Sequence, residues 1–354
     1  LAPEERTRLW TPVGIDPDWS RLATQVSRPS GGHRSATDSY FNWHDRGGLD
    51  WMTPVRSQAS CGSSFVFASV ASIEGQYKQA LGDSFLDIDL AEQSLVSCAS
   101  PGSCTNGGVS AVISARIKSD GIPDESCYPF IHGEGSCASQ CTDWSNRAAT
   151  IVDYHASQVA LSEQDIKQRL QAGPIAVSMR VYDDFYGYTT GVYSRSATAE
   201  LLGGQNVALV GWDDSDNSWI AKNSWDTGWG DNGYFKISRK DDCDALSKKG
   251  TCFATSLTYF DLTKANTPGA PCLDKHDIVM LVQKGSKATS GVEITNCGAR
   301  FGINYTLAET QKSGWLTTLP AAGTLASKTS GVIALTADAS KLDVGQYKSV
   351  VKVR

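Results

Sequence analysis

Residues 58–65 read Gln58-Ala59-Ser60-Cys61-Gly62-Ser63-Ser64-Phe65, and an apolar pattern of helical period follows directly. The apolar positions of that pattern are Val66, Val70, Ile73, Tyr77 and Leu81, with Gly82 after them as a stop signal. The spacing predicts a helix that opens at Ser64. Because a serine hydroxyl is a favoured acceptor at the start of a helix, Ser64 is also predicted to cap this helix, with a contribution of about 1 kcal/mol.

Two later segments can be read together with this one. The first is Gly203-Gly204-Gln205-Asn206-Val207-Ala208-Leu209-Val210-Gly211-Trp212. The second is Trp219-Ile220-Ala221-Lys222-Asn223-Ser224-Trp225, followed by Gly228-Trp229-Gly230-Asp231-Asn232-Gly233-Tyr234. The three segments resemble the landmarks of the papain-like cysteine peptidases, and weaker matches lie between them in the family's order. These matches are Leu90–Cys98, Cys104–Gly108, Tyr128–Phe130, Gly173–Val177 and Tyr186–Tyr193, so that the resemblance covers roughly Tyr40 to Asp261.

The register of the resemblance identifies the catalytic positions. In the papain family the first landmark reads Gln-x-x-Cys-Gly-Ser-Cys-Trp, and its second cysteine is the nucleophile. That position is Ser64 here, while Cys61 matches the structural cysteine. The family's general base is a histidine six residues before a glycine of the second landmark, and counting back from Gly211 gives Gln205. A slip of one residue would give Asn206 instead, but neither side chain titrates.

The resemblance assigns roles to three more residues. Gln58 matches the side chain of the oxyanion hole, Asn223 matches the partner that orients the base, and Trp225 matches the aromatic shield over that pair. Since Asn223 has no imidazole to orient, we predict an amide–amide contact between Gln205 and Asn223.

The chemistry of a peptidase is therefore degraded at two positions. A serine hydroxyl is a weak nucleophile that needs a base to remove its proton. An uncharged amide has no basic site near neutral pH, so Gln205 can neither accept that proton nor protonate a leaving amine. Groups that act as a unit lose their effect together. All five histidines lie outside the base motif; His44 is the one to examine, although a surface or packing role is favoured for it.

The substrate cleft is expected to persist. Gly107 and Gly108 match the family's extended segment, where small residues let a peptide backbone approach. The alternative is that both are turn glycines. The sequence has no paired-histidine insertion like the one that blocks the cleft of exopeptidase relatives, which implies a groove open at both ends. The expected partner is a peptide or a protein.

Composition narrows the classes of partner. The chain has 354 residues, of which 40% are hydrophobic and 20% charged, as in an ordinary globular protein of about two domains. A net charge of −6 and a pI near 5.4 argue against nucleic acid or an anionic membrane as partner, because both reward clustered Lys and Arg. No apolar run approaches the roughly 18 residues that span a bilayer.

Ten cysteines without a CxxC pair favour disulfides over a metal site, and no cofactor is predicted. Disulfides imply an oxidising location, so the protein is expected to be secreted, extracellular, periplasmic or at the cell surface. The resemblance pairs Cys61 with Cys104 and Cys98 with Cys137. Proximity in the sequence indicates the remaining pairs, which are Cys127 with Cys141, Cys243 with Cys252 and Cys272 with Cys297.

Three regions are expected along the chain. Residues 1–39 are polar, contain several prolines and are expected to be an N-terminal arm or the remnant of a pro-region. Residues 40–264 are expected to form a papain-like domain, an α+β fold with a helical half and an antiparallel β-barrel half. Residues 265–354 begin with a linker-like stretch and are predicted to form a C-terminal Ig-like β-sandwich, because short apolar runs alternate there with turn residues. The runs are Ile278–Val282, Val292–Thr295, Gly302–Leu307, Val332–Thr336 and Tyr347–Val353.

A second resemblance concerns this C-terminal region. Gly314–Pro320, Gly323–Leu325 and Asp343–Tyr347 are similar to segments of bacterial immunoglobulin-like accessory modules, including those of the BACON type. Such modules bind glycans or act as spacers, and the spacer role is favoured here.

The leading hypothesis is a secreted pseudo-peptidase with a papain fold that binds peptide or protein without cleaving it. One alternative is a cysteine endopeptidase engineered to be inactive at Ser64 and Gln205. A further alternative is a serine-dependent hydrolase or acyl transferase with a relocated base, which requires a titratable group within about 3.2 Å of Ser64 Oγ or one water away. In a fourth hypothesis the C-terminal sandwich is the functional part. If the chain is active as it stands, hydrolysis of peptide bonds is the expected reaction.

Overall fold

The computed structural model describes residues 38–86, 88–99, 103–157, 161–240, 250–263, 269–298 and 302–353. Contacts divide them into two compact units, one within residues 38–84 and Ile88–Thr263 and the other within Lys264–Arg354 together with Phe85–Asp87. The expected N-terminal arm falls almost entirely outside the described residues. Among those described, no helix combines the length and hydropathy needed to cross a bilayer.

The predicted helix is present as α2, Ser64–Leu81, and lies at the centre of the first unit. Every residue from Ser64 to Lys78 is buried, and most of these side chains are small or apolar; the larger polar ones are Glu74, Gln76 and Lys78. The helix ends where the sequence predicted, at Gly82, whose φ of 73° is a left-handed conformation that glycine adopts without strain.

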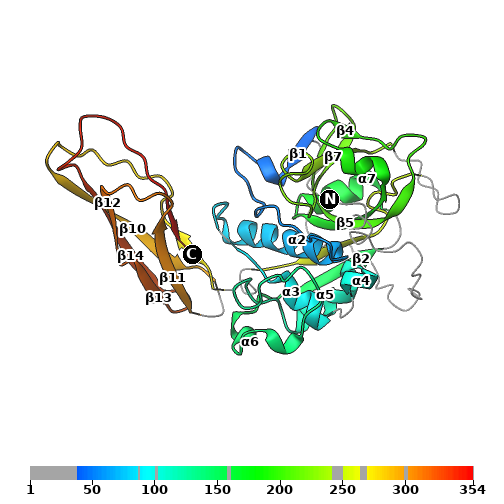
Figure 1. Ribbon diagram of the computed structural model, residues 1–354, viewed down its shortest axis with the longest axis horizontal. Helices are drawn as coiled ribbons and strands as arrows, with labels where there is room; N and C mark the ends of the chain where they lie inside the picture. Colours follow the sequence, from blue (N-terminus) through cyan, green and yellow to red (C-terminus); the bar gives the residue numbers. More distant parts are fainter. Residues whose placement is uncertain are drawn as a thin grey trace. The chain divides into compact units, whose positions relative to one another are not determined.

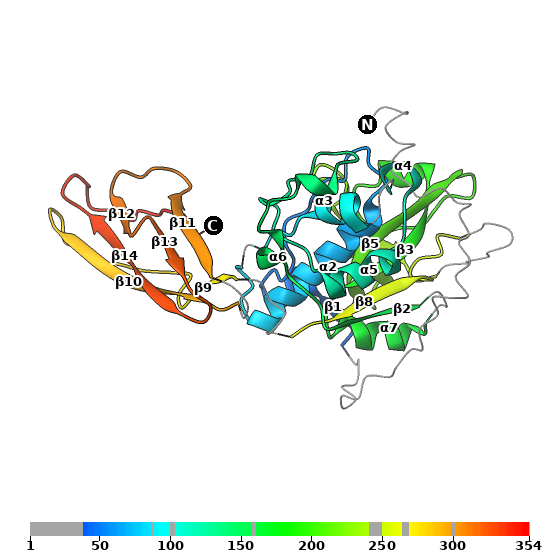
Figure 2. The same ribbon diagram turned by 90° about the horizontal axis from the view of Figure 1, so that it is seen from below.

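Figures 1 and 2 show α2 between β5 on one side and the short helices α3 and α5 on the other. The helices of this unit are α3 (Glu92–Ser94), α4 (Ser103–Asn106), α5 (Ser110–Ser119), α6 (Trp144–Arg147) and α7 (Glu163–Leu170). Single helical turns are η2 (Trp43–Asp45), η3 (Leu95–Ala99), η4 (Cys137–Ser139) and η5 (Asp183–Gly187). The helical half of the predicted α+β fold is therefore built around α2.

The β half is an eight-stranded sheet in the order β2-β8-β3-β5-β6-β7-β4, with β1 paired to β5. Its strands are β1 (Tyr40–Asn42), β2 (Asp153–Ser157), β3 (Ile175–Tyr182), β4 (Val192–Tyr193), β5 (Leu201–Asp213), β6 (Ser218–Lys222), β7 (Tyr234–Ser238) and β8 (Leu257–Asp261). The pairings are antiparallel as predicted, except that β4 runs parallel to β7. The core of this half includes Trp212 of β5, which is fully buried and stacked on Phe41 with ring centroids 4.7 Å apart.

The second unit consists of a four-stranded sheet in the order β12-β14-β10-β9 and a three-stranded sheet in the order β13-β11-β15. The strands are β9 (Pro271–Leu273), β10 (Lys287–Asn296), β11 (Ile303–Glu309), β12 (Leu316–Leu319), β13 (Ala322–Leu325), β14 (Ser330–Asp338) and β15 (Val351–Val353). Its core is small and is formed by Val292, Ile294, Tyr305, Leu325 and Ile333. The fold class is thus an α+β unit followed by a β-rich region, as predicted.

Of the predicted C-terminal strands, one is wrong and one is wrong in part. Ile278–Val282 forms no strand, and the last run is a strand only at β15. Ile278 packs against the core while Val279 and Leu281 are exposed, so the segment alternates as a strand does without pairing to any described strand. Alternating apolar residues favour an extended backbone, but they do not ensure that a neighbouring strand is available for pairing.

Disulfides close several loops. The structure joins Cys61 to Cys104, Cys98 to Cys137, Cys127 to Cys141, and Cys272 to Cys297. Cys252 is also disulfide-bonded, and Cys243, its expected partner, lies outside the described residues.

Candidate functional site

The turn that leads into α2 is held by backbone and disulfide contacts. Gln58 N–H donates to the carbonyl of Ser224 at 2.9 Å, which ties the turn to the segment after β6. Gly62 N–H donates to the carbonyl of Cys104 at 3.0 Å, beside the disulfide between Cys61 and Cys104. The start of α2 is therefore fixed from both halves of the unit.

Ser64 has a different role from the predicted one. The N-cap residue of α2 is Ser63, which makes no side-chain cap bond, and Ser64 is the first helical residue. The hydroxyl of Ser64 accepts a hydrogen bond from the backbone N–H of Asn206 in β5, at 3.1 Å. The predicted cap is wrong because Ser64 lies one position beyond the place where a side chain can cap, and its Oγ faces the sheet instead.

Gln205 lies at the centre of a buried group of amides. Its Nε2 donates to Gln58 Oε1 at 2.9 Å and to Asn223 Oδ1 at 3.0 Å. The predicted contact between Gln205 and Asn223 is therefore present. Ser64, Gln58 and Gln205 are 0% exposed and Asn223 is 3% exposed, so the structure brings the four candidate catalytic positions together away from solvent.

Sequence reasoning missed one member of this group, Ser224. Its hydroxyl donates to Gln58 Oε1 at 2.6 Å, and its backbone N–H donates to Asn223 Oδ1 at 2.9 Å. The only signal in the sequence was its position next to Asn223. Ser224 ties the oxyanion-hole candidate to the orienting residue, so the site is a network of neutral groups.

No titratable side chain within the described ranges hydrogen-bonds to Ser64 Oγ. His44 is not part of the site. Its ring stacks on Tyr234 with centroids 4.0 Å apart, and its Nδ1 lies 3.0 Å from Asp50 Oδ2. Across the described residues, no group of His, Cys, Asp and Glu side chains is arranged to hold a metal ion.

Trp225 lies in an aromatic cluster beside the amide network. Tyr186 stacks on it with centroids 4.9 Å apart and planes 13° apart, and the rings of Phe185 and Trp229 meet it edge-on. Trp225 is 8% exposed. Because this residue follows Ser224 directly, the cluster places an apolar wall next to the buried amides.

Glycine is favoured at Gly107 by the backbone conformation and at Gly108 by close packing. Gly107 has a φ of 68°, which favours glycine. A Cβ on Gly108 would lie 2.5 Å from the ring of Phe65, the residue after Ser64. The backbone of this segment is therefore pressed against the start of α2, and a role in holding peptide remains a prediction.

We expect Gly108→Ala to lower the free energy of unfolding by about 1–3 kcal/mol, because the new methyl group must displace the Phe65 ring from a packed site. Gly133→Ala is the matched control, since no atom lies within 4 Å of its added Cβ. Urea denaturation of both variants checks the prediction. Equal stability of the two variants would contradict it.

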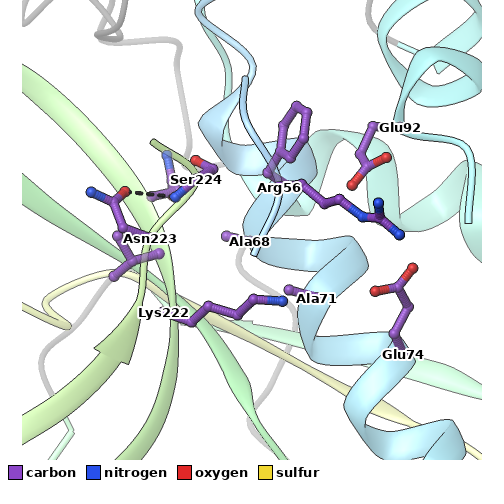
Figure 3. A pocket seen from close by; sticks show the side chains of 11 residues that line it. Arg56, Ala68, Ala71, Glu74, Glu92, Lys222, Asn223 and Ser224 are labelled. Carbon is purple, nitrogen blue, oxygen red and sulfur yellow. Dashed lines mark hydrogen bonds between the residues drawn. The ribbon is translucent and has the colours of Figure 1, made fainter. Parts of the chain in front are cut away.

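A cluster of charged side chains, of which Glu74, Glu92 and Lys222 are buried, lies next to this network around a cavity of about 10 Å³. Figure 3 shows Arg56 and Lys222 reaching toward Glu74 and Glu92 across this cavity. Lys222 Nζ donates to the carbonyls of Thr53 at 2.8 Å and Pro54 at 3.0 Å. Sequence reasoning missed the cluster, although a glutamate within the apolar pattern of α2 was a signal for it.

Burial changes the protonation of this cluster. It raises the pKa of Glu74 to about 7 against the opposing effect of Lys222, and it raises the pKa of Glu92 well above the usual range with help from neighbouring Glu74. Burial also lowers the pKa of Lys222 to about 8. Two buried carboxyls with raised pKa values thus lie beside the candidate site.

We expect the free energy of unfolding to fall as the pH rises from 4.5 to about 7. In the unfolded chain Glu74 ionises near 4.5, whereas the folded chain holds its proton up to about 7, so the folded state binds more protons within this window. Urea denaturation across this range measures the slope. Glu74→Gln should reduce the slope and Glu200→Gln, at an exposed position, should leave it unchanged. An undiminished slope in Glu74→Gln would refute the assignment.

Comparisons with known proteins show which proteins the chain is similar to. A family model described as papain family cysteine protease matches residues 37–254, which include every residue of the site. Digestive cysteine proteinase 2 of Homarus americanus is 33% identical over 205 residues, which make up 56% of this chain and 60% of that protein. Cathepsin S of Bos taurus is 30% identical over 246 residues, 68% of this chain and 70% of that protein.

A solved structure is also similar. The digestive procathepsin L2 proteinase from Tenebrio molitor larval midgut has a TM-score of 0.56 and 27% identity, over 74% of this chain and 81% of that chain. The match to the crustacean enzyme spans about three fifths of that enzyme's length.

Proposed function

The chain belongs to the papain family of cysteine proteases, and from that premise we propose that it is a pseudo-peptidase, which binds a peptide or protein segment without cleaving it. One observation carries the proposal. The Gln205 amide is bonded to both Gln58 and Asn223, and the register of the resemblance assigns Ser64 and Gln205 to the positions of the family's nucleophile and base.

Nucleophilic attack is the first step that fails. A thiol ionises with a pKa of about 8.5, and the start of a helix lowers this pKa further. An alcohol, in contrast, needs a base to take its proton. Ser64 Oγ instead accepts the backbone N–H of Asn206, which is no base. This contact also counts against a serine-dependent hydrolase or acyl transferase.

Other polar groups of the site also take part in hydrogen bonds within the protein. Gln58 Nε2, the donor expected to stabilise an oxyanion, donates to the carbonyl of Cys61 at 2.9 Å. Its Oε1 accepts from Gln205 and from Ser224. Gln58, Gln205 and Ser224 are thus bonded to one another, and none of these neutral groups transfers protons near neutral pH.

An engineered cysteine endopeptidase would have the same structure, and the two hypotheses differ only in the origin of Ser64 and Gln205. Comparison of the gene's codons at positions 64 and 205 with this sequence separates the two hypotheses.

We further propose that the protein is secreted, since its disulfides are stable in an oxidising location. Residues 40–264 would then form the peptide-binding domain, and residues 265–354 would form a spacer domain.

The experiment that tests the proposal is retention of peptides from a randomised synthetic heptapeptide library on the immobilised full chain, followed by mass spectrometry. We expect a subset of peptides to be retained and to be recovered at their original masses. Recovery of fragments would overturn the pseudo-peptidase assignment, and the absence of any retained peptide would overturn the binding role.

A further inference from the structure

One extended run of the second unit belongs to neither of its sheets. The run reads Ile278-Val279-Met280-Leu281-Val282, and all of its side chains are apolar. Val279 is 89% exposed and Leu281 is 95% exposed, while Ile278 packs against the core. Among the residues that the structure describes, none forms a backbone hydrogen bond with this run. The run therefore alternates as a strand does and presents backbone donors and acceptors that a second strand can bind.

Most of the edge strands in this unit carry features that discourage pairing with another chain. Of the four edge strands in the described part of the unit, β9 begins at Pro271, β12 is followed by Pro320 and β15 contains Lys352. Proline has no N–H to donate, and lysine keeps an edge charged and hydrated. The run 278–282 contains no proline, glycine or charge. An exposed apolar edge without such protection is typical of a surface that pairs with another chain.

The run is complementary to a second copy of itself. In an antiparallel pair centred on Met280, Val279 of one copy lies opposite Leu281 of the other. Directly opposed side chains share one face of the ladder, so the two exposed side chains of each copy would cover those of the other. At the flanks, Asp277 lies opposite Gln283, so that no like charges meet there.

The charge of the chain also favours contact through this run. Each copy carries a formal net charge of −6, so two copies repel each other over much of their surfaces. An uncharged run adds no repulsion and requires no buried ion pair. Five residues bury less than the roughly 1,200–2,000 Å² of a stable interface, so the pairing should be weak, with a Kd of about 10 µM to 1 mM.

We propose that residues 278–282 form an edge strand through which two copies of this chain associate, by antiparallel pairing of the run with itself. Backbone hydrogen bonds join the two strands, and Val279 and Leu281 of both copies supply the apolar contact. Because the pairing is two-fold symmetric and uses the same run in both copies, it closes at a dimer. The proposal concerns the second unit and does not depend on peptide binding by the first.

Sedimentation equilibrium of the full chain tests the proposal. As the concentration rises to about 1 mM, the apparent mass should rise from 37.9 kDa toward that of a dimer. Leu281→Lys and Val279→Lys each place a charge in the contact and should raise the Kd at least about 10-fold. The double variant Val279→Lys with Leu281→Glu should recover part of the association, because the introduced lysine of one copy lies opposite the introduced glutamate of the other.

Val332→Lys is the matched control. Val332 is 66% exposed, but it belongs to β14, which is paired with β10 and β12 on its two sides. This variant should associate as the natural chain does. A natural chain that stays at the monomer mass up to about 1 mM would overturn the proposal, as would a mass that exceeds the dimer. Association that survives in Leu281→Lys, equal weakening by Val332→Lys, or a double variant that recovers nothing would overturn it as well.

Discussion

The double variant Ser64→Cys with Gln205→His is expected to hydrolyse peptides at least about 100-fold faster than the natural chain, because it restores a nucleophile and a general base together. A cysteine at residue 64 would lie in the first turn of α2, where the positive end of the helix dipole favours a thiolate. An imidazole at residue 205 would lie next to Asn223 Oδ1, which Gln205 Nε2 already contacts at 3.0 Å. The structure thus keeps the partner that orients a base.

The two single variants are the controls for this experiment. Ser64→Cys and Gln205→His should each gain far less activity than the double variant, since nucleophile and base act as a unit. Fluorogenic peptide substrates measure the hydrolysis, and circular dichroism establishes that each variant is folded. A folded double variant without activity would contradict the account, because it would place the defect in the cleft as well as in Ser64 and Gln205.

Lys222→Met is expected to lower the free energy of unfolding by about 3–5 kcal/mol, the typical cost of removing one partner from a buried set of charges. Lys222 is 4% exposed, and the carbonyls of Thr53 and Pro54 accept hydrogen bonds from its Nζ. Methionine has a similar length but no donor. The substitution therefore leaves both carbonyls with a lost bond and removes a cation that faces Glu74.

Lys284→Met provides the matched control for Lys222→Met. Lys284 forms an ion pair with Asp343 in which both side chains are mostly exposed, and such pairs contribute less than about 1 kcal/mol. In urea denaturation Lys222→Met should lose several times more stability than Lys284→Met. The double variant Lys222→Met with Glu74→Gln should recover part of the loss. Equal stability of the two single variants would refute the role assigned to Lys222.

Local spacing was sufficient to predict the elements that carry the site. The helical period after Ser64 and the stop at Gly82 gave α2, and the resemblance to the papain family gave the register of Gln205 and Asn223. Since that register also implies that the two amides meet, their contact could be predicted without coordinates. The error at Ser64 was an offset of one residue, because periodicity does not distinguish the cap from the first helical position.

Contacts between distant segments were beyond the sequence. Ser224 bonds to Gln58 across 166 positions, and the charged side chains Arg56, Glu74, Glu92 and Lys222 come from four separate segments. Periodicity along one segment carries no information about which side chains meet when the two halves of the unit pack. The strand predicted at Ile278–Val282 is absent for the same reason. A strand forms only when a neighbouring strand is available for pairing, and the segment itself does not encode that neighbour.

As a pseudo-peptidase, the natural chain is expected to bind peptide and leave it intact. The most direct measurement compares the natural chain with Ser64→Ala for release of fragments from a randomised peptide library over an extended incubation, with bound peptide measured in parallel. We predict that both forms retain peptide and that neither releases fragments above the rate without protein. Fragment release by the natural chain that Ser64→Ala abolishes would show that Ser64 is a working nucleophile and would refute the pseudo-peptidase assignment.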